Sequence, residues 1–198
     1  MDQQFIESGL NFTFHSAHWQ VKKYDDHPYF TGFSSVGMKG VDFVAIRENK
    51  ELWLIEVKNY KSNGERVREA KIKASLEQPE KIKEAVEQKF EDTLAGIRAI
   101  HTYYKRKNRK RWKWLSRWQK PDQEERFWLQ VCELAIDPNR VKLILWLELD
   151  TSYRALRSWL MEHLGKNEEA LQDYSIFCFN QEEYPYKDSL LLGVDKIK

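Results

Sequence analysis

Two adjacent apolar segments constrain the fold of this 198-residue chain more than any other feature. They are Val41–Ile46 and Leu52–Val57, and the short polar stretch Arg47–Glu51 separates them. Apolar segments of this length that are rich in β-branched residues and flank a polar stretch predict a β-hairpin. Asn49 lies at the middle of the polar stretch, where a turn is expected.

A turn centred near Asn49 brings two acidic residues together. Asp42 then lies opposite Glu56, and opposed residues on neighbouring strands have Cβ atoms only about 5 Å apart. Strand alternation places Lys58 on the same face as Glu56. Two adjacent carboxylates repel each other unless a cation lies between them, and a divalent metal ion is a common solution. A lysine beside such an ion can orient or deprotonate a water molecule for attack on phosphorus.

These three residues resemble the motif of the PD-(D/E)XK nuclease superfamily, in which an acid opens one strand and (D/E)-x-K closes the next. The resemblance implies that Asp42 and Glu56 bind the metal ion and that Lys58 acts on the water. We expect Mg²⁺, with Mn²⁺ as a substitute, and the backbone carbonyl of Val57 as a further ligand. Val41 stands where the superfamily has its proline, which has no chemical role. A solvated hairpin end with an ordinary Glu–Lys pair is the alternative interpretation.

A second feature is a basic segment between Tyr103 and Lys120, which holds nine Lys or Arg and no acid. The whole chain is +2 and this segment is +9, so the other 180 residues sum to −7. Such asymmetry predicts contact with a polyanion, because neutralising phosphates releases counterions. The interleaved tryptophans suit stacking on bases. A solvated basic loop or a protein-binding surface is the alternative. The residues expected to contact nucleic acid are Lys105, Arg106, Lys107, Arg109, Lys110, Arg111, Trp112, Lys113, Trp114 and Arg117.

The order of predicted elements indicates one α/β domain over residues 1–198. It predicts a mixed central β-sheet flanked by helices. This arrangement is similar to the restriction-endonuclease-like core, here with a basic, Trp-rich helical insertion at about 103–120. In chain order we expect a helix at 2–8, strands at 10–15, 19–24 and 29–33, the hairpin, a long helix from Pro79, a helix from Asp122 to Ala135, a strand at 141–149, a helix to Leu164 and a strand at 175–180.

The sequence therefore predicts a metal-dependent nuclease that hydrolyses phosphodiester bonds, in DNA in preference to RNA. The alternatives are a nucleic-acid-binding module that does not cut, and a protein-binding subunit of a larger assembly with the same fold. Two further residues are weaker site candidates. Glu7 is interpreted as an exposed acid of the predicted first helix, and Gln88, on the long helix, has no assigned role.

Composition indicates the class of protein and the compartment in which it is expected. Hydrophobic residues make up 41% of the chain, which is typical of a globular protein. No apolar run approaches the ~20 residues that span a bilayer, and the two cysteines lack metal-ligand spacing. We therefore expect a cytoplasmic protein that does not bind membranes. A homodimer is one expected oligomeric state, since cutting both strands at one locus usually needs two active sites.

Overall fold

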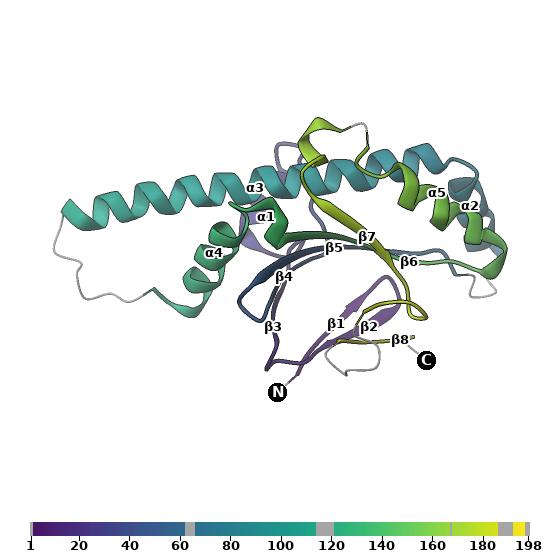
Figure 1. The fold of residues 1–198 in the computed structure, drawn as a ribbon, viewed down its shortest axis with the longest axis horizontal. Coiled ribbons are helices and arrows are strands. Elements are labelled where there is room, and N and C mark those ends of the chain that lie inside the picture. Colours follow the sequence, from purple (N-terminus) through teal and green to yellow (C-terminus); the bar gives the residue numbers. More distant parts are fainter. Residues whose placement is uncertain (1, 62–65, 114–120, 167, 186–191, 197–198) are drawn as a thin grey trace.

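The structure is a computed structural model that describes residues 2–61, 66–113, 121–166, 168–185 and 192–196 (Figure 1). The described strands are β1 Gln3–Glu7, β2 Leu10–Phe14, β3 Trp19–Lys23, β4 Phe43–Arg47, β5 Glu51–Asn59, β6 Val141–Glu148, β7 Ser175–Phe179 and β8 Leu192–Lys196. The α-helices are α1 Pro28–Ser34, α2 Arg66–Leu76, α3 Pro79–Lys113, α4 Gln123–Leu134 and α5 Arg154–His163, with short 3₁₀ turns η1 Pro138–Arg140, η2 Thr151–Tyr153 and η3 Glu169–Leu171.

Five strands form the central sheet in the order β3-β4-β5-β6-β7. The first three strands are antiparallel neighbours, whereas β5, β6 and β7 run parallel. Parallel strands need crossover connections, and α3 with α4 connects β5 to β6 while α5 connects β6 to β7. The predicted α/β class with a mixed sheet is confirmed.

The helices cover one face of this sheet, and α3 and α4 both pack against β5. In α3 the buried residues Ile82, Val86 and Phe90 recur every four positions, which makes one apolar stripe on a helix. The helix begins at Pro79, as predicted, because proline fits the first helical position. It continues to Lys113, and its C-terminal part extends beyond the sheet (Figure 1).

A three-stranded antiparallel sheet of order β1-β2-β8 covers the opposite face. Phe12 of this small sheet packs against Phe43 and Trp146 of the central sheet, with ring centroids 5.4 and 5.3 Å apart. The prediction that helices flank the central sheet therefore holds for one face only. The second core is made by two sheets packed face to face.

Two predicted elements have the wrong type. The segment predicted as a helix at 2–8 is β1, because residues Ser8 and Gly9, with φ of 50° and 77°, form a tight turn that pairs it with β2. The segment predicted as a strand at 29–33 is α1. His27 caps this helix by accepting the Tyr29 backbone N–H, and Pro28 occupies its first turn.

Candidate functional site

The central hairpin brings Asp42 and Glu56 together as predicted. Its turn uses the left-handed conformation at Glu48 and Asn49, with φ of 48° and 56°. The register pairs Phe43 of β4 with Ile55 of β5, so the next residue outward on each strand is Asp42 or Glu56. Both carboxylates consequently lie at the open end of the hairpin, on the face where Lys89 of α3 contacts them.

The backbone and α3 together fix the position of Asp42. The Val57 N–H donates to Asp42 Oδ2 at 2.6 Å, which ties the carboxylate to β5. On the helix side, Thr93 Oγ1 accepts the Val41 N–H at 3.0 Å, and Asp92 Oδ2 accepts the Lys39 N–H at 2.8 Å. Only 7% of Asp42 is exposed. The segment that leads into β4 is therefore held against α3 at two points.

Glu56 is fully buried and lies between two lysines. Lys58 Nζ lies 2.8 Å from Oε1 and forms an ion pair with it. This contact lacks the geometry of a hydrogen bond, and Oε1 has no hydrogen-bond partner among the described residues. Lys89 Nζ lies 2.8 Å from Oε2 and donates a hydrogen bond to it. The predicted side-by-side placement of Glu56 and Lys58 is confirmed.

Lys89 is a site residue that the sequence analysis missed. It belongs to α3, and its Nζ also lies 3.7 Å from Asp42 Oδ1, so it contacts both carboxylates. Glu87, two residues earlier, points elsewhere on the helix: it is bonded to Lys83 and to the Gly165 N–H. The signal for Lys89 was its place one residue before Phe90, on the edge of the buried stripe of α3.

The Asp42 carboxyl has a strongly altered proton affinity. Burial, and next the nearby charge of Glu56, raise the pKa of Asp42 from 3.8 to about 7, against the opposing effects of Lys89 and the Val57 N–H. Burial and the charge of Glu56 also raise the pKa of the Tyr60 phenol. Strongly raised carboxyl pKa values are typical of sites that bind cations or transfer protons.

Glu7 also lies near this site, and not on an exposed helix as predicted. One carboxylate oxygen each of Glu7, Asp25 and Asp42 lie within 4.8 Å of one another. Glu7 is at the end of β1, where Lys23 Nζ lies 3.2 Å from it. Asp25 Oδ1 is buried and has no hydrogen-bond partner among the described residues, and burial raises the pKa of this carboxyl. Asp42 is thus close to Glu56 and also to two more acids.

The other predicted residues stand apart from the carboxylates or outside the described residues. Gln88 Oε1 accepts a hydrogen bond from Lys39 Nζ at 2.9 Å, on an exposed part of α3. Lys105 and Arg106 are exposed on α3. The side chains of Lys107, Arg109, Lys110, Arg111, Trp112 and Lys113, and residues Trp114 and Arg117 entirely, lie outside the described residues.

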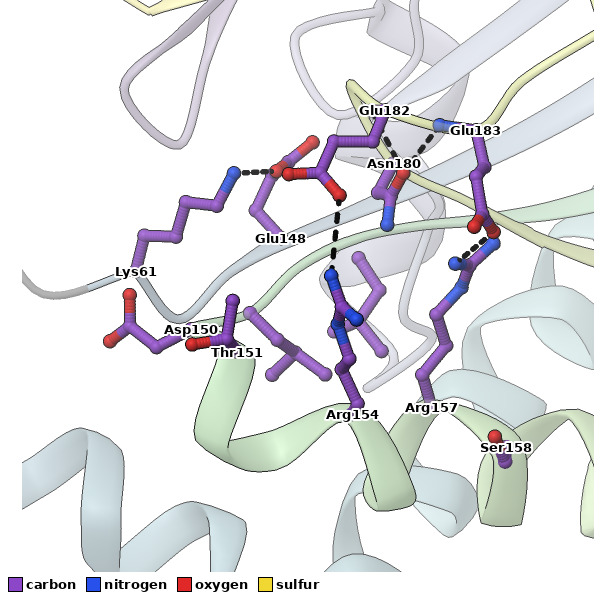
Figure 2. Close-up of a pocket in the computed structure, with 12 residues that line it drawn as sticks. Lys61, Glu148, Asp150, Thr151, Arg154, Arg157, Ser158, Asn180, Glu182 and Glu183 are labelled. Atoms are coloured by element: carbon purple, nitrogen blue, oxygen red, sulfur yellow. Dashed lines mark hydrogen bonds and ion pairs between the residues drawn. The ribbon is translucent and has the colours of Figure 1, made fainter.

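A separate polar pocket of about 300 Å³ lies at the ends of β6 and β7, and Figure 2 shows the side chains that line it. Glu148 is buried there and accepts a hydrogen bond from Lys61 Nζ at 2.5 Å. Arg157 lies 2.5 Å from Glu183, and Arg154 lies 4.0 Å from Glu182. Three basic side chains of this pocket therefore each pair with an acid that also lines it.

The donor set around Asp42 fits a hard divalent cation. Its groups are carboxylate oxygens, which Mg²⁺ and Mn²⁺ prefer to nitrogen or sulfur. Two buried carboxylate oxygens of this neighbourhood, Glu56 Oε1 and Asp25 Oδ1, have no hydrogen-bond partner within the described part of the chain. Of Val57, the structure describes the N–H that positions Asp42; its carbonyl as a ligand stays a prediction.

No protein-family model, no curated protein and no solved structure matches this chain. Among the described residues, none of the helices combines the length and the apolar character required to cross a membrane. The site therefore has to be interpreted from its own geometry.

Proposed function

We propose that this chain is a metal-dependent phosphodiesterase that cleaves nucleic acid, DNA in preference to RNA, on a restriction-endonuclease-like core. The observation that carries the proposal is the buried pair Asp42 and Glu56 at the open end of the β4–β5 hairpin, with Lys58 2.8 Å from Glu56. An acid, a second acid and a lysine on one sheet face provide the groups that hydrolysis of a phosphodiester requires.

The sheet supports the fold part of this proposal. Three antiparallel strands are followed by two parallel ones, with a long helix after the hairpin, and this part of the order is what the resemblance implies. The small sheet β1-β2-β8 replaces helices on one face, and it contributes Glu7 to the neighbourhood of Asp42. The exposed Lys105 and Arg106 begin the basic segment in the last third of α3, and the C-terminal end of this helix extends beyond the sheet (Figure 1).

Each residue of the site has a distinct task in the proposed reaction. Asp42 and Glu56 hold the divalent cation, which when bound neutralises charge on the phosphate and lowers the pKa of water. Lys58 orients the attacking water in line with the scissile bond and stabilises the charge that develops on the phosphoryl oxygens. The Val57 N–H keeps Asp42 in place, which removes the cost of ordering this carboxylate during the reaction.

A cleavage assay with end-labelled DNA and RNA, single- and double-stranded, tests the proposal. We expect cleavage with Mg²⁺ or Mn²⁺ and none with EDTA. Asp42→Asn and Glu56→Gln remove the charge of each acid and should abolish cleavage while the protein still binds the substrate. Asp173→Asn makes the same change at an exposed position and should remain active.

Other outcomes identify the alternatives. Cleavage in EDTA, or full activity of Asp42→Asn, would refute the proposed site. Binding of nucleic acid without cleavage would favour a binding module, and absence of both would favour a protein-binding subunit.

A further inference from the structure

We propose that Lys89 is an internal counter-ion that occupies the place of a divalent cation between Asp42 and Glu56, and that cation binding displaces it. This inference rests on the proposed function and adds a step to it: the site changes between a lysine-bound and a metal-bound form. Lys89 would then weaken metal binding and stabilise the protein when metal is absent.

The contacts of the Lys89 ammonium are those expected of a bridging cation. Its Nζ lies 2.8 Å from Glu56 Oε2 and 3.7 Å from Asp42 Oδ1, so it joins the two acids across the hairpin. A metal ion shared by these acids must approach an oxygen of each to about 2.1 Å. The ammonium already uses Glu56 Oε2 and approaches Asp42 Oδ1, so both cations cannot occupy this place together.

Lys58 is not equivalent to Lys89 in this respect. It contacts the other oxygen of Glu56, Oε1, and it comes from the same strand as that acid. Lys89 comes from α3 and contacts both acids, which places its charge between them. Lys58 can therefore keep its contact with Oε1 while Lys89 leaves.

Burial explains why the metal-free site needs this lysine. Glu56 is fully buried and Asp42 is 7% exposed, and two adjacent buried carboxylates without a counter-charge are costly. Lys89 is suited to a reversible role because 23% of its side chain is exposed and its stem has four rotatable bonds. The ammonium can leave towards solvent without repacking the core.

Mn²⁺ binding to the whole chain, followed by the EPR signal of the free ion, tests this inference without any substrate. Lys89→Met should bind Mn²⁺ at least about tenfold more tightly than the wild type, because a charge-assisted hydrogen bond no longer has to be broken. Lys89→Arg retains the charge and should bind weakly, as the wild type does. Lys81→Met removes the same charge from an exposed position of the same helix and should leave the affinity unchanged.

Thermal melting provides a second readout that also works for a destabilised variant. Without metal, Lys89→Met should melt at a lower temperature than the wild type, and Mn²⁺ should raise its Tm by more. An affinity of Lys89→Met equal to or weaker than that of the wild type would overturn the inference. So would equal tightening in Lys81→Met, because it would show a general effect of charge.

The results separate this inference from the proposed function. If the wild type binds Mn²⁺ and Lys89→Met binds it no better, the counter-ion role fails and the metal site stands. If Lys89→Met binds Mn²⁺ more tightly than the wild type and the double variant with Asp42→Asn does not bind it, both stand. If neither the wild type nor Lys89→Met binds Mn²⁺, the metal site itself fails and the inference fails with it.

Discussion

Replacing Asp42 by asparagine should stabilise the metal-free protein at neutral pH while removing the proposed activity. The substitution preserves shape, and the asparagine carbonyl can still accept the Val57 N–H that Asp42 Oδ2 accepts at 2.6 Å. The substitution removes the negative charge next to Glu56 and places an amide NH₂ group, a hydrogen-bond donor, where Asp42 has Oδ1. The destabilising effect of the buried charge disappears while the local packing stays intact.

The magnitude follows from the proton affinity of Asp42. Its pKa is raised from 3.8 to about 7 by burial and the charge of Glu56, so between these values the folded state retains a proton that the unfolded state loses. Stability therefore falls as pH rises through this window. One pKa unit corresponds to 1.36 kcal/mol, which gives a total of about 4 kcal/mol above pH 7. Well below pH 3.8 the carboxyl is protonated in both the folded and the unfolded state, and its contribution to the free energy of unfolding is zero.

Urea unfolding in EDTA at pH 4, 5.5 and 7.5 measures this term. The advantage of Asp42→Asn over the wild type should be close to zero at pH 4 and should grow to about 4 kcal/mol at pH 7.5. Asp173→Asn, at an exposed position, should differ from the wild type by no more than about 0.5 kcal/mol at every pH. A constant difference between Asp42→Asn and wild type across the range, or a less stable variant at pH 7.5, would refute the reasoning.

Three further predictions concern the site, the fold and the basic segment. Lys58→Ala should lower the cleavage rate about 10²-fold with little change in substrate affinity, and normal cleavage with poor binding would instead make Lys58 a backbone anchor. Burial opposes ionisation of Glu124, but its hydrogen bonds with Lys22, His27 and Trp128 lower its pKa below 4.5. The ionised carboxylate therefore stabilises the protein above pH 4.5, and this stabilisation is lost as pH falls further. The difference in urea stability between wild type and Glu124→Gln should shrink from pH 7 to pH 3, and a difference independent of pH would contradict this. Removing six charges of the basic segment should weaken nucleic-acid binding across sequences and flatten its salt dependence, and an unchanged salt slope would exclude this segment as the binding surface; the six are Lys105, Arg106, Lys107, Arg109, Lys110 and Arg111.

The hairpin and its acids could be predicted because they depend on local sequence. Alternation over two short strands and one turn sets which residues face each other, so the register around Asn49 also placed Asp42 beside Glu56. The long helix could be predicted for the same reason, since its apolar stripe and Pro79 lie within the segment itself.

Contacts between distant segments could not be predicted in this way. Lys89 lies 33 residues from Glu56, and its Glu-x-Lys context with Glu87 looks like that of any surface helix. The segment 2–8 becomes a strand because the turn at Ser8 and Gly9 pairs it with β2, and the sheet is completed by β8 at Leu192–Lys196, far along the chain. Glu7 then comes near Asp42 because the small sheet packs against the central sheet.

The negative charge of the two carboxylates is the feature that favours cation binding, because an amide has the same shape without the charge. If Asp42 and Glu56 served only to join β4 and β5, an amide would make the same hydrogen bond to the Val57 N–H without the cost of a buried charge. An amide is a far poorer ligand for a divalent ion than a carboxylate. If Asp42→Asn gains stability without metal and loses the Tm increase that Mn²⁺ gives the wild type, the charge serves the ion. If it gains stability and keeps that increase, the cation binds elsewhere, and the acids Glu7 and Asp25 become the next ligands to replace.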